Sequence, residues 1–81
     1  MPIKRITDEI VLQAIEDLCG DGYCLVADVL DALPRGRRHL DRRSAISRTV
    51  RRGLAIERRG PDGRAHIAIS SEGWRALREM A

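Results

Sequence analysis

Residues 41–64 read DRRSAISRTVRRGLAIERRGPDGR and predict a helix that runs almost directly into a β-hairpin. On a helical wheel, apolar and small side chains share one face, namely Ala45, Ile46, Thr49 and Val50. Serine and arginine fall on the opposite face, at Ser44, Ser47, Arg48 and Arg51. Gly53 ends this helix, which we place over about residues 41–52 with Asp41 as its N-cap. One face is therefore predicted to pack, and the other to offer hydroxyls and guanidiniums to solvent.

The hairpin is predicted over about residues 54–69. Leu54 and Ile56, and then Ile67 and Ile69, alternate with polar or small residues, as half-buried strands do. Residues 60–63, Gly-Pro-Asp-Gly, are a strong turn signal between them. The arginines beside this turn are therefore expected near the tip of the hairpin.

Three more helices and a short strand surround this core motif. Thr7 is a favourable N-cap for a helix over about residues 7–19, which stops at Gly20-Asp21-Gly22. An extended piece at about 23–25 leads to a shorter helix at about 26–33, ended by Pro34. A last helix over about 71–80 is capped by Ser70 or Ser71, with Trp74 and Leu77 toward the core. The order helix, short strand, helix, helix, hairpin, helix predicts a single α+β domain over residues 1–81.

Charge divides the chain into two halves. Residues 35–64 hold eleven arginines and three acids, a net charge of +8, whereas residues 1–33 have a net charge of −5. The overall +3 hides this division. Eight excess charges on one helix and hairpin repel one another unless a polyanion binds them. The placement of the arginines therefore favours a nucleic-acid surface.

Several other classes of function lack support in the sequence. Cys19 and Cys24 are five residues apart and are accompanied by no second ligand pair, so no metal or cofactor site is predicted; a disulfide between them stays open. His39 and His66 have no carboxylate nearby in sequence to orient them, and no nucleophile motif is present, so we expect no enzyme. Acidic residues interrupt every apolar run near the N-terminus, which indicates a cytoplasmic protein without a membrane span.

Three strings resemble winged helix-turn-helix regulators of the MarR-like type. Residues 44–52 are similar to the recognition helix of that group, and residues 53–59 to its Gly-Leu-Ile-x-Arg entry into the wing. Residues 70–77 resemble its Thr-x-Glu-Gly start of the next helix. The resemblance implies the winged-helix fold and DNA binding. The interval from Ser47-Arg48 to Gly53 is about one turn short, and long flanking helices are not seen, so small-molecule sensing is not carried over.

The candidate DNA-binding residues follow from the predicted surface. Arg48 and Arg51 are the expected base readers, because arginine can donate two hydrogen bonds to guanine in the major groove. Ser44 and Ser47 lie beside them. Phosphate or minor-groove contacts are expected from the loop, the helix flanks and the wing, at Arg37, Arg38, Arg42, Arg43, Arg52, Arg58, Arg59 and Arg64.

The leading hypothesis is a double-stranded DNA-binding protein, a small transcriptional regulator that reads paired half-sites, with a homodimer as one form. A first alternative is a protein-interaction module that uses the acidic half, namely Asp8, Glu9, Glu16, Asp17, Asp21, Asp28 and Asp31. A second is a binder of structured RNA. Neither a membrane nor a small-molecule ligand is expected as a partner.

Overall fold

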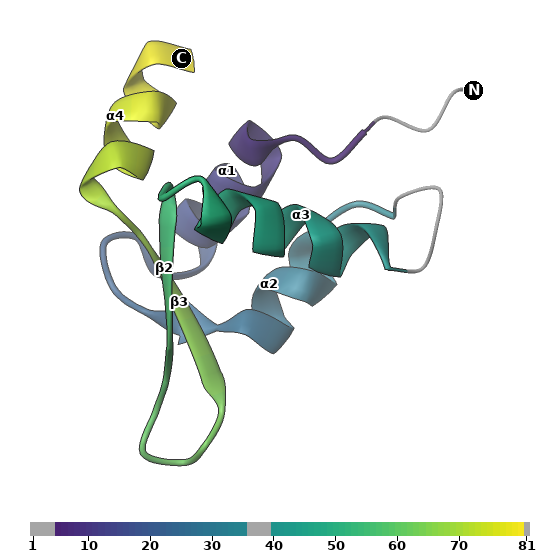
Figure 1. Ribbon diagram of the computed structural model, residues 1–81, viewed down its shortest axis with the longest axis vertical. Coiled ribbons are helices and arrows are strands. Elements are labelled where there is room, and N and C mark those ends of the chain that lie inside the picture. Colours follow the sequence, from purple (N-terminus) through teal and green to yellow (C-terminus); the bar gives the residue numbers. More distant parts are fainter. Residues whose placement is uncertain (1–4, 36–39, 81) are drawn as a thin grey trace.

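A computed structural model describes residues 5–35 and 40–80 and has the predicted order of elements (Figure 1). These elements are α1 (Asp8–Cys19), β1 (Cys24–Leu25), α2 (Val26–Ala32), α3 (Asp41–Arg51), β2 (Ala55–Arg59), β3 (Ala65–Ile69) and α4 (Ser71–Met80). Most of the predicted boundaries of the helices and strands agree with the observed boundaries within one residue. Helices α2 and α3 form a helix-turn-helix, and the β2–β3 hairpin extends beyond the helices in Figure 1 as a wing.

The three strands form one antiparallel sheet in the order β1-β3-β2. Ala55 pairs with Ile69 and Arg59 with Ala65, so the hairpin is in regular register along its length. The turn closes with Gly60 N–H donating to the Arg64 carbonyl at 2.8 Å. Gly63 has a φ of +79°, a conformation that glycine adopts without strain. The predicted Gly-Pro-Asp-Gly turn is therefore confirmed.

The core lies between α1 and the sheet, and α2, α3 and α4 close it. Its buried apolar residues are all aliphatic, as expected for a chain without phenylalanine: Ile6, Val11, Leu12, Ile15, Val29, Leu33, Ala45, Ile46, Ala55, Ile67, Ile69 and Leu77. Trp74 packs against this group and stays half-buried. The apolar face predicted for α3 is thus the face that packs.

Two predicted helix caps are confirmed by hydrogen bonds. Thr7 Oγ1 accepts the Ile10 N–H at 3.3 Å at the start of α1. Ser70 Oγ accepts the Gly73 N–H at 3.0 Å at the start of α4, and it donates to the Gly53 carbonyl at 2.5 Å. The second contact ties α4 to the turn between α3 and the wing.

Gly73 lets α4 approach that same turn closely. A Cβ built at Gly73 would lie 2.0 Å from the carbonyl oxygen of Leu54 and 2.7 Å from Cγ2 of Ile69. Neither distance leaves room for a methyl group. The glycine of the Glu-Gly pair therefore has a packing reason in this fold.

Two details of the prediction are wrong. The N-cap of α3 is Leu40 rather than Asp41, because Asp41 is already the first residue of the helix and the Leu40 carbonyl accepts the Ser44 N–H at 2.9 Å. In β2, Ala55 is the buried residue and Ile56 is 48% exposed. Since neighbouring side chains of a strand point to opposite faces, inward-facing Ala55 places Ile56 outward.

Candidate nucleic-acid interface

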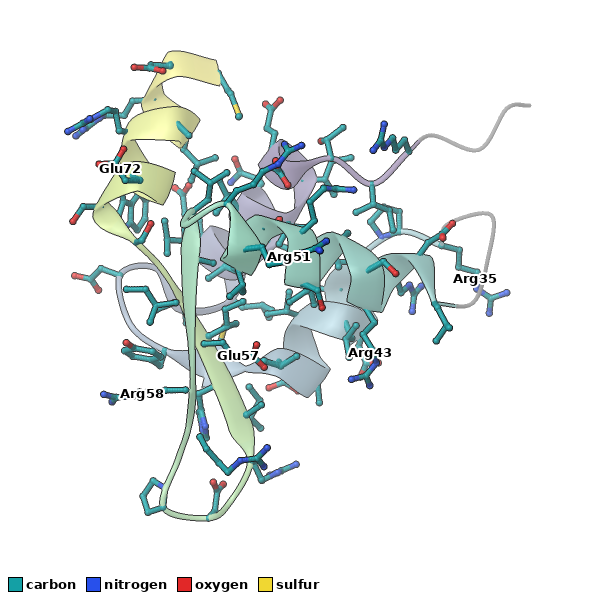
Figure 2. All side chains as sticks on the ribbon, viewed as in Figure 1. Arg35, Arg43, Arg51, Glu57, Arg58 and Glu72 are labelled. Atoms are coloured by element: carbon teal, nitrogen blue, oxygen red, sulfur yellow. The ribbon has the colours of Figure 1, made fainter. Side chains whose placement is uncertain are left out.

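The outward side of α3 carries a continuous polar stripe. Three of its residues are spaced three or four apart, at Ser44, Ser47 and Arg51, and Arg43 lies beside them. The apolar Leu40 lies in the same line at the N-terminal end of the stripe. These five residues together line one shallow depression, and all of them are exposed. Figure 2 shows Arg43 toward the start of α3 and Arg51 toward its end. The structure thus brings four of the predicted site residues, Arg43, Ser44, Ser47 and Arg51, onto one surface.

Arg48 does not belong to this surface, which corrects the prediction that it lies opposite the packed face. Its Nε lies 3.2 Å from Oδ1 of Asp8, and its Nη2 donates to the Ile6 carbonyl at 2.5 Å. The Arg48 side chain is only 21% exposed. At about 100° per residue, it lies on the flank of α3 that faces α1. The Arg48 guanidinium is therefore directed at α1 rather than along the outward side of α3.

Arg52 reaches the same carboxylate from one turn further along. Its Nη1 lies 2.5 Å from Oδ2 of Asp8, while most of the side chain, 61%, stays exposed. Thr49, fully buried between the two arginines, donates its hydroxyl hydrogen to Oδ1 of Asp8 at 2.9 Å. One carboxylate of α1 thereby receives three side chains from α3 and its C-cap.

The protonation of Asp8 reflects these contacts. Its side chain is 9% exposed, and this burial by itself raises the pKa. Hydrogen bonds from Thr49, Arg48 and Arg52 act in the opposite direction and prevail, so the pKa of Asp8 lies below its ordinary value. Asp8 is therefore a carboxylate at neutral pH. It neutralises part of the positive charge on this flank of α3.

Asp8 is the residue whose role sequence reasoning missed. Its position favours the dipole of the first helix and an acidic docking surface, but its burial removes it from any such surface. Arg48 and Arg52 are one helical turn apart, so their guanidiniums are close enough for a single carboxylate to pair with both. Nothing in the sequence indicates that this acid lies about 40 residues earlier.

Arg42 is tethered rather than free. Its Nε donates to the carbonyl of Pro34 at 3.3 Å, and the residue is half-buried. The contact links the start of α3 to the segment that follows α2. Arg37 and Arg38, also predicted as phosphate contacts, lie outside the described residues.

The wing carries three exposed arginines with different surroundings. The guanidinium of Arg58 lies 4.2 Å from the centre of the Tyr23 ring, a cation–π contact between the wing and the segment before β1. Arg59 Nη1 donates to the Gly63 carbonyl at 2.5 Å, within the hairpin. Arg64 follows the turn, where its N–H donates to Asp62 Oδ1 at 3.0 Å. In Figure 2, Arg58 points to the side of the hairpin away from α3.

The two cysteines are free thiols. Cys19 Sγ donates to the carbonyls of Ile15 and Gly22, at 3.4 and 3.3 Å, and Cys24 faces the Ile67 carbonyl at 3.9 Å. Burial, followed by the neighbouring Cys19 thiol, raises the pKa of Cys24 to about 12. At neutral pH Cys24 is therefore a protonated thiol, which is a poor nucleophile and a poor metal ligand.

Residues 5–35 and 40–80 form neither a metal-binding cluster nor a membrane-spanning helix. Within these two ranges, no group of three histidine, cysteine or acidic side chains is arranged to hold a metal ion. The helices described are also too short and too polar to cross a membrane.

Comparison with known proteins identifies the fold. No protein-family model matches the chain, and no curated protein matches it by sequence. Among solved structures, the chain is similar to BpsR of Bordetella bronchiseptica, a protein whose DNA binding is regulated by 6-hydroxynicotinic acid. The TM-score is 0.69 at 23% identity, over 90% of this chain and 49% of the BpsR chain, so the chain spans about half of that protein. The resemblance noted in the sequence is thereby confirmed at the level of the fold, and this chain has the winged helix-turn-helix fold.

Proposed function

We propose that this protein binds double-stranded DNA, with α3 in the major groove and the β2–β3 wing against the adjacent phosphates or minor groove. The observation that carries the proposal is the polar stripe on the outward side of α3, at Arg43, Ser44, Ser47 and Arg51. Arginine offers paired donors to guanine, and serine bonds either bases or phosphates. The major groove of B-form DNA is wide enough to admit one helix.

The spacing of the two arginines in this stripe suits a short run of base pairs. Arg43 and Arg51 are eight residues apart, which is a rise of about 12 Å along a helix. Successive base pairs are about 3.4 Å apart, so the two guanidiniums would reach positions about three to four base pairs apart. Ser44 and Ser47 lie between them. We therefore infer that Arg43 and Arg51 mark the two ends of the bases read by α3.

The wing would contribute to the affinity for DNA in general rather than to the preference for a particular base sequence. Arg58, Arg59 and Arg64 are all exposed on a hairpin that extends from the body of the molecule. Contacts with phosphates fix the register of a protein on DNA and carry no sequence information of their own. The stacking of Arg58 on Tyr23 reduces its freedom, so less conformational entropy would be lost when it meets a phosphate.

A transcriptional regulator is the biological role that this surface supports best. The fold is shared with BpsR, whose DNA binding is regulated, and helix-turn-helix proteins commonly bind paired half-sites as dimers. We accordingly include paired half-sites about 10 base pairs apart, or a multiple of that, in the proposal. Analytical ultracentrifugation with and without a selected duplex would test this part separately.

The direct test is a duplex-binding series at increasing salt, measured by fluorescence anisotropy. Arg43→Ala and Arg51→Ala should each weaken binding to a selected sequence by about 1–3 kcal/mol and leave nonspecific binding nearly unchanged. Arg59→Ala and Arg64→Ala should weaken binding to all sequences alike. Each should also reduce the slope of log affinity against log salt by about 0.9 for every phosphate that the variant no longer neutralises.

The matched control is Arg75→Ala. Arg75 lies on α4, is 63% exposed and pairs only loosely with Glu72 at 3.5 Å, so its replacement removes the same charge from another face. Equal losses of affinity for Arg75→Ala and Arg51→Ala would mean that net charge alone drives binding, and α3 would then read no bases. If no duplex binds at low salt while a structured RNA does, the RNA alternative replaces this proposal.

A further inference from the structure

Leu40 is an unusual residue for its position. It occupies the N-cap of α3, where serine, threonine, aspartate and asparagine are preferred because they accept a hydrogen bond from the first turn. A leucine side chain offers no such bond. The residue is also 53% exposed, so it contributes little to the core. An apolar side chain is thus exposed at a position where a capping side chain is usual, and such local exceptions tend to occur at functional sites.

Leu40 is also held in register with the polar stripe of α3. Its carbonyl accepts the Ser44 N–H at 2.9 Å, so the helical repeat already includes it. It lines the same depression as Arg43, Ser44, Ser47 and Arg51. A single apolar side chain therefore stands at the N-terminal end of an otherwise hydrogen-bonding surface. In helix-turn-helix proteins, this end of the recognition helix contacts base edges.

The apolar group that an unmodified base pair presents in the major groove is the 5-methyl of thymine. We propose that Leu40 packs against a thymine methyl group and selects thymine over cytosine at one position of the bound site. Arg43 lies three residues further, a rise of about 4.5 Å, or little more than one base-pair step. The thymine should therefore lie one or two base pairs from the position that Arg43 contacts. This inference rests on the proposed binding of duplex DNA.

The test uses thymine and deoxyuridine, which differ at the base by that methyl group alone. A duplex is first selected from a randomised pool with the unaltered chain, and each thymine is then replaced in turn by deoxyuridine. At one position the replacement should weaken binding about fourfold, which corresponds to the burial of one methyl group. Leu40→Ala should bind the thymine and deoxyuridine duplexes equally well at that position.

Leu40→Ser is the second variant, and it separates recognition from folding. Leu40 is 53% exposed, so this variant should melt close to the wild type by circular dichroism while it loses the thymine preference. A melting temperature lower by more than about 8 °C would mean that Leu40 serves stability, and it would overturn the inference. The inference would also be overturned if either variant kept the thymine preference. The same holds if the wild type bound the thymine and deoxyuridine duplexes equally well at every position.

The outcomes also distinguish this inference from the function on which it rests. If duplexes bind but the pool yields no preferred sequence, DNA binding stands and the role of Leu40 is refuted. If no duplex binds at low salt, the proposed function fails, and the inference fails with it.

Discussion

Replacement of Asp8 by asparagine should destabilise the protein strongly, because this carboxylate holds α1 to α3. Oδ1 of Asp8 meets Thr49 at 2.9 Å and Arg48 at 3.2 Å, and Oδ2 meets Arg52 at 2.5 Å. Asparagine keeps one acceptor oxygen and places an NH2 group where the other oxygen was. One arginine would then face a donor instead of an acceptor, and the negative charge that both arginines share would be gone.

The size of the effect follows from the exposure of each partner. A hydrogen bond to a charged group contributes about 1.5–3 kcal/mol when it is sheltered from solvent. Arg48, at 21% exposure, is close to that case, whereas Arg52, at 61%, behaves as a surface pair that contributes at most about 1 kcal/mol. Asparagine retains part of the Thr49 contact. We therefore expect a loss of about 2–3 kcal/mol, which for a domain of this size lowers the melting temperature by about 10–20 °C.

Thermal melting followed by circular dichroism at pH 7 measures this loss, with Glu9→Gln as the matched control. Glu9 is the next residue of α1, also acidic and in the first turn, but it is exposed. It should therefore show only the small dipole effect of losing one negative charge. If Asp8→Asn melts within about 2 °C of the wild type, or if Glu9→Gln falls as far, the reasoning about the buried carboxylate is refuted.

Three further outcomes follow from the structure. The stability that Asp8 provides is complete above its unfolded pKa of about 3.9 and is lost as the pH falls through its lowered folded pKa, so acid titrations of wild type and Asp8→Asn should converge below about pH 4. Cys24, with a pKa of about 12, should be alkylated by iodoacetamide at pH 8 on the order of a thousandfold more slowly in the folded protein than in urea, as read by peptide mass spectrometry. Gly73→Ala should lose about 1–3 kcal/mol in urea denaturation, because its Cβ would lie 2.0 Å from the Leu54 carbonyl oxygen, whereas Gly22→Ala, with a nearest contact of 3.5 Å, should change little. A Gly73→Ala chain as stable as the wild type would contradict that packing.

The placement of the helices and of the wing was predictable because turn chemistry is local. Thr7, Ser70 and the Gly-Pro-Asp-Gly turn each act within a few residues, and each appears in the structure where the sequence indicates it. The inward face of β2 was not predictable in the same way. The alternating pattern points to Leu54 and Ile56, whereas the structure buries Ala55 and leaves Ile56 48% exposed. The face is set by pairing with β3, where Ala55 lies opposite Ile69, and this long-range register is not contained in the local pattern.

The face of α3 was predicted in its middle and missed at its flank. Ser47 and Arg51 lie at the centre of the outward side, so a small error in the assumed rotation per residue does not change the face to which they are assigned. Arg48 lies on the border, where a guanidinium can turn to solvent or to a neighbouring helix. The carboxylate of Asp8 attracts the Arg48 guanidinium to the neighbouring helix, and Asp8 lies about 40 residues earlier in the sequence. A count of charges along the sequence cannot show such a contact, because it treats every arginine as free.

The contact at Asp8 changes what the arginine cluster predicts about binding to DNA. Asp8 cancels one of the two charges of Arg48 and Arg52, and both guanidiniums are oriented toward α1 rather than along the outward stripe. The salt dependence of binding counts the phosphates that the protein neutralises, with a slope of about −0.9 for each. Arg48→Ala should therefore leave that slope almost unchanged while it lowers the melting temperature. Arg64→Ala should do the reverse, since Arg64 is exposed on the wing. An equal change of slope in both variants would show that Arg48 leaves Asp8 when DNA binds, and the separation of positioning from contacting arginines would then be wrong.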